Sequence, residues 1–405
     1  MCYNKEEYGA HAQKKKKEVT VMNCDRLFEE LEALFPEYMD ILEQACLLES
    51  PTADKAAVDA VSYYLADVAK KKGFDIEVFP QPVSGDVIGI LMNGEVDAKQ
   101  IVYSGHTDTV HPKGLFPAPV VRRDGDKMWG PGTLDCKGGV VAALMAMDAL
   151  KRLGYKKRPL ALWIMPDEET SSIQSGKATI NYIVERAKDA VAFLNLEGGS
   201  YGKALVARKG ILRYELTVHG IAGHSSQCPD YANAVTEAAH KIIELEKLKD
   251  IKGLTCNCGV IHGGTVGNSV AAECKFIADI RFSTLAEKEE AIAIVKRVAE
   301  TVHIPRCTCD VREVSYRPPM EATEKNYALL DKINKISAEV GLPHMEPKQG
   351  LGGSDAAYST IAGIPTLDSI GYTGKDCHSV KEYVDMPSIL LAAKYFAATA
   401  EYIED

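Results

Sequence analysis

The chain has 405 residues, of which 46% are hydrophobic and 26% are charged, the composition of an ordinary globular protein. At about 150 residues per domain, this length predicts two or three domains. The 47 Lys and Arg against 57 Asp and Glu give a net charge of −10, which disfavours nucleic-acid binding because phosphate recognition needs clustered cations. No apolar run approaches the roughly 20 residues of a membrane helix, and the N-terminus lacks the apolar segment of a secretory signal. We therefore expect a soluble, cytoplasmic protein without a membrane or nucleic-acid partner.

The 11 cysteines show no disulfide-framework spacing, and in a chain of this length they indicate reduced thiols. Cys256 and Cys258 share strand phase with Val260, so this pair is expected on an apolar strand face. Cys307 and Cys309 repeat the pattern. Structural zinc sites favour wider cysteine spacing, so core packing is favoured over a metal cluster.

Residues 1–20, which include a lysine run, are expected to form a disordered tail. Beyond them, helical and strand patterns alternate. The expected helices span 24–48, 53–72 and 138–153, and the expected strands span 74–79, 87–92, 100–104, 160–165 and 190–194. The last two strands are continuous apolar runs, as in strands that helices cover on both faces. This predicts an α/β fold with a central mixed sheet flanked by helices.

The pattern changes after residue 209. Strands are expected at 211–219, 255–262, 269–282 and 307–316, with helices at 231–248 and 285–302. The order β-α-β-β-α-β is that of a ferredoxin-like α+β module. The sequence Arg317-Pro318-Pro319 predicts a hinge, and a helix at 326–340, a strand at 364–370 and a helix at 387–402 then complete the first sheet. We therefore predict a ferredoxin-like domain, residues 210–318, inserted into a larger domain formed by residues 21–209 and 319–405.

Metal-ligating residue types follow the expected strands of the larger domain at several places. A spacing of two puts His106 and Asp108 (SGHTDTV) on one face of extended backbone, which suits a histidine ligand oriented by a carboxylate. Three consecutive acids, 167–169, follow a buried strand, where they are costly unless a cation neutralises them. Taken singly, each motif has an ordinary interpretation: a surface pair for His106 and Asp108, or a helix N-cap for Asp135 in GPGTLDCKGG.

Together, these places supply two histidines and three carboxylates. The candidate metal ligands are His106, Asp135, Glu169, Glu197 and His378. This donor set suits two Zn²⁺ ions (Co²⁺ or Mn²⁺ would also fit) bridged by one carboxylate at a separation of about 3.5–4 Å. One remaining acid, Glu168 or Glu169, can act as general base on a metal-bound water. Agreement among the five places favours a metal-dependent hydrolase over the ordinary interpretations.

Seven motifs occur in a characteristic order: SGHTDTV, GPGTLDCKGG, PDEETSS, NLEGG, AGHSS, GGSDAAYS and CHSVKEYV. They resemble the M20 family of co-catalytic zinc peptidases and amidohydrolases, which includes glutamate carboxypeptidase, aminoacylase, acetylornithine deacetylase and succinyl-diaminopimelate desuccinylase. The resemblance covers nearly the whole chain, from about residue 24 to the C-terminus.

The resemblance implies roles for individual residues of the larger domain. Asp135 would bridge two Zn²⁺ ions per subunit, next to a cis peptide bond between Asp135 and Cys136. One ion would be held by His106 and Glu197, and the other by Glu169 and His378. Glu168 would be the catalytic base, and Asp108 would orient His106.

The inserted domain, by the same resemblance, is a lid and dimerisation domain. His224 in AGHSS would reach the partner subunit's active site and stabilise the tetrahedral oxyanion, although by itself a histidine in such a loop would be an ordinary exposed residue. Asn268 and Arg281 would hold the substrate carboxylate, a task that suits a guanidinium, with Gly353 and Ser354 placing backbone donors nearby. A phosphate cradle at GLGGSD is rejected because the flanking residues of nucleotide-binding loops are missing.

The sequence therefore predicts a dinuclear zinc hydrolase that cleaves an amide or peptide bond next to a free α-carboxylate. A glutamate-carboxypeptidase-like exopeptidase is the leading hypothesis, because GGSDAAYS and CHSVKEYV are most similar to that branch. An aminoacylase, deacetylase or dipeptidase is the alternative, and a non-catalytic scaffold is disfavoured because every ligand is present. Lys203, Arg208 or Lys209 is a candidate to meet an acidic substrate side chain, with surface charge as the equal alternative. The expected partners are a small peptide or N-acyl amino acid and a second copy of the chain.

Overall fold

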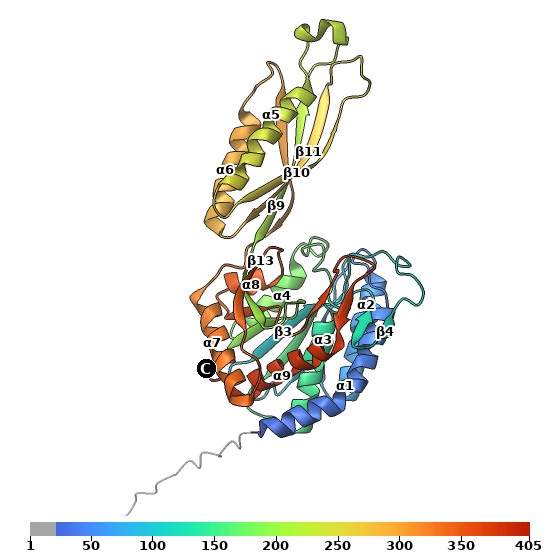
Figure 1. The fold of residues 1–405 in the computed structure, drawn as a ribbon, viewed down its shortest axis with the longest axis vertical. Coiled ribbons are helices and arrows are strands. Elements are labelled where there is room, and N and C mark those ends of the chain that lie inside the picture. The colour runs from blue at the N-terminus through green and yellow to red at the C-terminus, as the bar shows by residue number, and fades with distance from the viewer. Residues whose placement is uncertain (1–21) are drawn as a thin grey trace, which may run out of the picture.

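The computed structural model describes residues 22–405, so the tail expected over residues 1–20 lies outside the described part. A large body carries an eight-stranded sheet, and a smaller body with its own four-stranded sheet projects from it (Figure 1). The chain enters the smaller body through β9 (Gly210–His219) and leaves it through β12 (Thr308–Arg317). The predicted fold class, a central mixed sheet with an inserted ferredoxin-like module, is confirmed.

The large sheet has the strand order β1-β2-β6-β3-β7-β14-β8-β13. Its strands are β1 (Asp75–Phe79), β2 (Val87–Met92), β3 (Ile101–His106), β6 (Leu160–Met165), β7 (Ala192–Asn195), β8 (Lys203–Arg208), β13 (Glu346–Gly350) and β14 (Thr366–Asp368). The central strand β3 runs parallel to both neighbours, β6 and β7, whereas β2 is antiparallel to β6. Every residue of β3, β6 and β7 is buried, as expected for strands covered on both faces.

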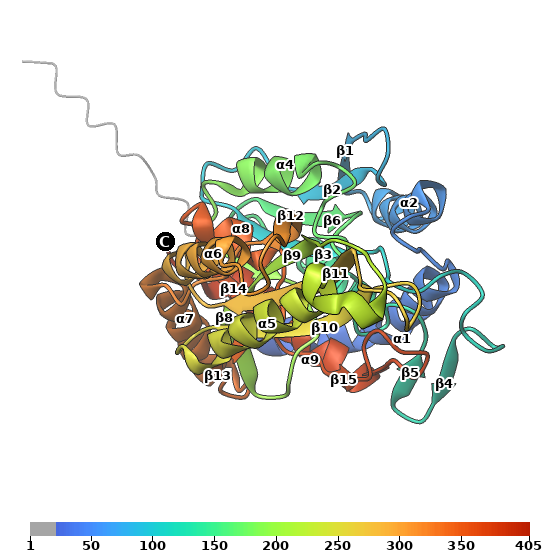
Figure 2. The same cartoon turned by 90° about the horizontal axis from the view of Figure 1, so that it is seen from above.

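Helices cover both faces of this sheet: α4 lies on one side, and α1 and α9 lie on the other (Figure 2). The helices are α1 (Cys24–Leu47), α2 (Lys55–Lys71), α3 (Lys137–Arg152), α4 (Ala178–Ala187), α7 (Glu324–Val340), α8 (Ala356–Ile361) and α9 (Met386–Tyr402). The middle of α3 is wholly buried, since it packs against β3, α1 and α9. None of the helices in the described range combines the length and apolarity needed to cross a membrane.

The inserted body, here called the lid, has the strand order β10-β11-β9-β12, and all its strand pairs are antiparallel. Its further elements are α5 (Ala234–Glu246), β10 (Thr255–Gly263), β11 (Glu273–Phe282), α6 (Leu285–Glu300) and the 3₁₀ helices η1 (Ser225–Asp230) and η2 (Lys247–Asp250). Alternate residues of β9 are buried, and this face packs with α5 and α6 to form a separate core. The predicted β-α-β-β-α-β order is therefore present.

The cysteine pairs of the lid follow the prediction in part. Cys256 and Cys307 are buried in the lid core, and Cys258 and Cys309 are half-buried against it. Val260 does not share that face and is 47% exposed. The expected common phase is wrong there because a β-bulge between Asn257 and Val260 shifts the register.

A third, small sheet was not predicted. It has the order β15-β16-β5-β4, and its strands are β4 (Arg122–Asp124), β5 (Lys127–Trp129), β15 (Gly374–Lys375) and β16 (Tyr383–Asp385). Strands of two or three residues, most of them polar or charged, carry no apolar alternation that a sequence pattern could reveal. In this sheet, the strand that precedes Gly130 (β5) pairs with the strand that follows Glu382 (β16).

Candidate metal centre

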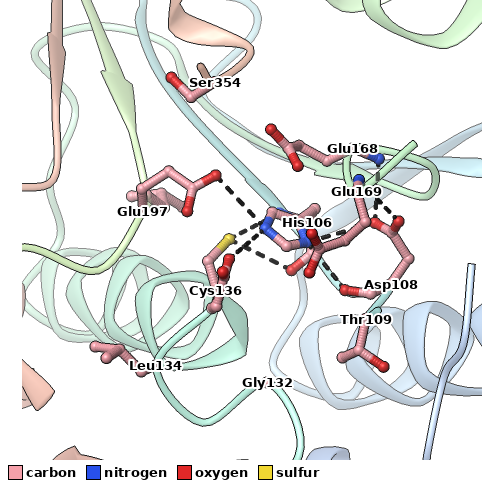
Figure 3. A network of polar contacts seen from close by, with 12 residues as sticks. His106, Asp108, Thr109, Gly132, Leu134, Cys136, Glu168, Glu169, Glu197 and Ser354 are labelled. Atoms are coloured by element: carbon pink, nitrogen blue, oxygen red, sulfur yellow. Dashed lines mark hydrogen bonds and ion pairs between the residues drawn. The ribbon is translucent and has the colours of Figure 1, made fainter. Parts of the chain in front are cut away.

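The predicted ligands come from neighbouring strand ends of the large sheet. His106 is the last residue of β3, and β3 lies between β6 and β7, the strands that precede Glu169 and Glu197. Because these three strands are parallel, their carboxyl ends meet at one edge of the sheet, where α/β proteins commonly bind ligands. Asp135 lies in the loop before α3, and His378 lies between β15 and β16. Figure 3 shows Glu197, Glu169 and Cys136 around the ring of His106.

The side chains divide into two groups that share Asp135. Its Oδ1 lies 3.0 Å from Nε2 of His106, and its Oδ2 lies 3.1 Å from Nε2 of His378. Glu197 Oε1 is 3.5 Å from Nε2 of His106, and Glu169 Oε2 is 3.3 Å from Nε2 of His378. Tetrahedral ligands about 2.1 Å from a Zn²⁺ ion would be separated by about 3.4 Å, so these spacings suit two ions on either side of one carboxylate.

The pKa values of the carboxylates indicate that this cluster is suited to a cation. Burial raises the pKa of Glu169 to about 8 and that of Glu197 to about 7, and the nearby Asp135 carboxylate adds to both shifts. Burial also opposes ionisation of Asp135, but hydrogen bonds with His106 and His378 outweigh it and lower the pKa of Asp135. Hydrogen bonds to Asp135 and Glu169 raise the pKa of His378 to about 11. A divalent cation would replace these protons, so the donor set fits the metal that the sequence predicts.

Cys136 lies next to His106, and its sulfur is hydrogen-bonded to the backbone. The thiol sulfur accepts a hydrogen bond from the backbone N–H of His106 at 3.0 Å, and burial raises the pKa of Cys136 well above its ordinary value. His106, Cys136 and Glu197 also bring their donor atoms close enough together to share a metal ion. The peptide bond between Asp135 and Cys136 is cis, as the resemblance implies.

Asp108 ties the histidine to the acidic loop. Nδ1 of His106 lies 3.0 Å from the carbonyl oxygen and 3.4 Å from Oδ1 of Asp108. The Asp108 carboxylate also accepts the backbone N–H groups of Glu168 and Glu169, both at 3.2 Å, and the hydroxyl of Thr52 at 2.8 Å. Such a partner fixes the orientation of a ligating imidazole.

Glu168, the predicted base, is held by an arginine. Arg317 donates through Nη1 to Oε1 of Glu168 and through Nη2 to the main-chain carbonyl of Glu168. Its Nε donates to Oγ of Ser171 at 3.0 Å. Gly353 packs against the aliphatic part of the Arg317 side chain, because a Cβ there would lie 2.8 Å from Cδ of Arg317. Gly353 therefore lies next to the residue that holds Glu168, a residue that the sequence suggested only as part of a hinge.

The remaining predicted site residues of the larger domain are spread around this centre. Ser354 is buried and donates through Oγ to Asp368 Oδ2 at 2.6 Å. Arg208 donates to the same oxygen at 2.6 Å, so its charge is already paired. Lys209 donates to the carbonyl oxygen of Gly253 in the lid at 3.1 Å. Lys203 is exposed at the start of β8.

The lid residues lie apart from the metal ligands. His224 is next to Asn268 in space, since the N–H of Ser225 donates to the Asn268 carbonyl at 3.1 Å. Arg281 donates through Nε to Asp279 at 2.6 Å. Within residues 22–405, no hydrogen bond joins the side chains of His224, Asn268 or Arg281 to the metal-ligand cluster.

Comparison with known proteins identifies the family of this chain. The model of peptidase family M20/M25/M40 matches residues 102–402. Carboxypeptidase G2 of Pseudomonas sp. (strain RS-16) is 29% identical over 363 residues, which cover 87% of this chain and 86% of that protein. The aminopeptidase PepT of Bacillus cereus superposes with a TM-score of 0.73 at 20% identity, covering 94% of this chain and 98% of that one. A dinuclear metal-binding M20 peptidase of Bacillus subtilis gives a TM-score of 0.67 at 14% identity, covering 91% and 98%.

The matched range contains all the predicted metal ligands, from His106 to His378. The resemblance found in the sequence is thereby confirmed. The chain belongs to peptidase family M20/M25/M40 and is a metallohydrolase that acts on peptide or amide bonds.

Proposed function

We propose that this protein is a dinuclear zinc hydrolase that cleaves an amide or peptide bond next to a free α-carboxylate, in the manner of a glutamate-releasing carboxypeptidase. One observation carries the proposal: the two oxygens of Asp135 face different histidines, His106 at 3.0 Å and His378 at 3.1 Å. The similarity to carboxypeptidase G2 supports the exopeptidase activity, and that to the Bacillus subtilis peptidase supports two metal ions.

The residues around the cluster have separate tasks in this proposal. Two bound divalent cations would polarise the scissile carbonyl and make water more acidic. Glu168 takes the proton of the attacking water and returns it to the leaving amine nitrogen. Arg317 binds Oε1 of Glu168, which leaves Oε2 for that proton. Asp108 keeps His106 in the orientation that a metal ligand needs.

The substrate carboxylate is assigned to residues of both bodies. Gly353 and Ser354 would offer backbone donors, and Asn268 and Arg281 would approach from the lid. Because no hydrogen bond within the described residues joins the side chain of Asn268 or Arg281 to the metal-ligand cluster, the proposal requires the lid, or the lid of another copy, to come closer on binding.

The proposed assembly is a homodimer formed through the lid. Strand β10 is an edge of the lid sheet, and Val260 and Ile261 on it are each 47% exposed. An unpaired edge with exposed apolar side chains is suited to pairing with another chain. In such a dimer, His224 of each chain would stabilise the oxyanion in the partner's site. Mixing His224→Ala chains with Glu168→Ala chains should restore part of the activity, because one site per mixed dimer is complete; no restoration would refute the shared site.

A screen of dipeptides, N-acyl glutamates and other N-acyl amino acids, scored for the released amino acid, tests the proposed reaction. Release of glutamate that stops after Glu168→Ala, with metal retained, is the expected result. Release from simple N-acyl amino acids but not from peptides would assign the chain as an amidohydrolase instead. No release from any compound by the zinc-loaded protein would refute the proposal.

A further inference from the structure

Glu382 holds the loop that carries Asp135 by an unusual set of contacts. Its carboxylate is 1% exposed and accepts three backbone N–H groups from one loop: Leu134 at 2.9 Å and Asp135 at 3.0 Å on Oε1, and Gly132 at 3.3 Å on Oε2. The loop lies more than 240 residues earlier in the chain. Glu382 lies within the motif CHSVKEYV, but the sequence analysis assigns no role to it and the proposed reaction does not use it.

The small sheet places Glu382 at this point. Strands β5 and β16 are antiparallel, with Trp129 opposite Tyr383. The next residues along, Gly130 and Glu382, therefore face each other, and Gly130 N–H donates to the Glu382 carbonyl at 3.3 Å. The side chain then extends along the loop that runs from Gly130 to Asp135.

A carboxylate suits this loop better than a neutral group would. Among residues 22–405, no backbone carbonyl accepts a hydrogen bond from these three N–H groups, and Gly132 has a left-handed φ of +76° that prevents regular structure. Buried donors left without partners are costly, and hydrogen bonds to an ionised acceptor are the stronger kind. His111 Nε2, also buried, lies 3.5 Å from Oε2 and adds a further polar group on the same side.

We infer that Glu382 is a positioning residue for the metal centre, which fixes the bridging Asp135 relative to His378. His378 lies four residues before Glu382, and it shares Asp135 with the other metal ligands. The inference rests on the proposed metal site. Because Asp135 would contact both ions, loss of this clamp weakens both metal sites together. Loss of His378 itself removes a ligand of one ion only.

The test measures zinc affinity and stoichiometry by competition with a chelator, for the wild type and for Glu382→Gln. Glutamine keeps the size and one acceptor oxygen but puts an N–H₂ group against N–H donors. We expect affinity for both ions to fall about 10- to 100-fold, the range for residues that orient metal ligands. Glu382→Ala should lose more zinc affinity than Glu382→Gln. In contrast, His378→Ala should retain one tightly bound ion.

The matched control is Glu401→Gln. Glu401 is also buried (3% exposed) and accepts Met22 N–H at 2.7 Å and Lys157 Nζ at 2.8 Å, away from the metal ligands. The Glu401→Gln variant should bind zinc as the wild type does. The second readout is the gain in melting temperature on adding zinc, which should shrink for Glu382→Gln and stay unchanged for Glu401→Gln.

Three results with Glu382→Gln would overturn the inference. The first is wild-type zinc affinity at both sites, and the second is loss of affinity at one site alone. The third is a melting temperature that falls equally with and without zinc, which would mark a purely structural role. A wild-type chain that binds fewer than two ions would instead refute the proposed metal centre, so the two failures are distinguishable.

Discussion

Arg317, the last residue of the final lid strand, donates to the carboxylate of Glu168, in the loop that follows β6. Tyr316, the residue before Arg317, makes a second link to the same loop. Lys177, at the end of that loop, donates through Nζ to the Tyr316 carbonyl at 3.3 Å. The point where the lid returns to the larger domain is therefore joined to the proposed base. Any movement of the lid about residues 317–319 acts on the loop that carries Glu168 and Glu169.

Arg317→Ala should destabilise the protein strongly. Arg317 and Glu168 are 5% and 9% exposed in their side chains, so the substitution leaves a buried carboxylate without its partner. Breaking a buried ion pair on one side typically costs about 3–5 kcal/mol in the free energy of unfolding. Urea unfolding measures it. Arg312→Ala is the control, because that ion pair with Glu215 is exposed and should contribute at most about 1 kcal/mol. An equal loss in the free energy of unfolding for Arg317→Ala and Arg312→Ala would contradict this account.

Glu168→Gln should bind metal but turn over at least about 100-fold more slowly, since a general base contributes that much or more. In the part of the chain that the structure describes, the Glu168 side chain makes no hydrogen bond to His106 or His378, so the proposed metal ligands should stay in place. Metal content and turnover of the purified variant are the measurements. Glu185→Gln, at a highly exposed position on α4, serves as the control. Activity close to that of the wild type would exclude Glu168 as the base.

The stability of the chelated protein should fall as the pH rises. Burial raises the pKa of Glu169 to about 8 and that of Glu197 to about 7, so their protonated forms are the stabilising ones. That contribution is complete below the ordinary glutamate pKa of about 4.3 and is lost as the pH passes through 7 and 8. The raised pKa of His378, about 11, acts in the same direction and is lost at higher pH.

Zinc binding requires these ligands without their protons, so it should release protons near neutral pH. The gain in melting temperature on adding zinc should therefore be larger at about pH 8.5 than at about pH 6. Differential scanning fluorimetry at the two pH values, with chelator or with zinc, measures this difference. A gain that is larger at the lower pH would show that Glu169 and Glu197 do not bind the metal.

Asp108→Ala should weaken zinc binding about 10- to 100-fold, because His106 loses the group that orients its ring and the acidic loop loses two acceptors. Chelator competition measures the change. Asp124→Ala, at an exposed position in β4, is the matched control and should bind zinc normally. An unchanged affinity in Asp108→Ala would mean that His106 is oriented by its other contacts.

The sequence predicts most of the elements that carry an apolar pattern, although β8 and α4 were missed. Strands β2 and β6 occur with the expected bounds, since buried runs such as Leu160–Met165 have few other interpretations. Strand β13, with the sequence EPKQG, was missed because it is a polar edge strand that only its parallel pairing with β8 defines. The short strands of the small sheet were also missed, because they too are defined by their pairing and not by an apolar pattern.

Four of the proposed metal ligands were predicted because each follows a recognisable strand or lies in a glycine-rich loop, and His378 was predicted from its place in the motif CHSVKEYV. The roles of Arg317 and Glu382 could not be predicted, because their partners are 149 and up to 250 residues away in the chain. Glu382 lies within the motif CHSVKEYV, but the motif does not show what its carboxylate contacts. The candidates for an acidic substrate side chain show the same limit. The sequence could not reveal that Arg208 is paired with Asp368.

Diffraction from zinc-loaded crystals, collected at the zinc absorption edge, tests the central claim most directly. Two anomalous peaks about 3.5–4 Å apart are expected on either side of the Asp135 carboxylate. One ion should be bound by His106 and Glu197, and the other by His378 and Glu169. A single peak, or peaks bound by other side chains, would contradict the dinuclear centre.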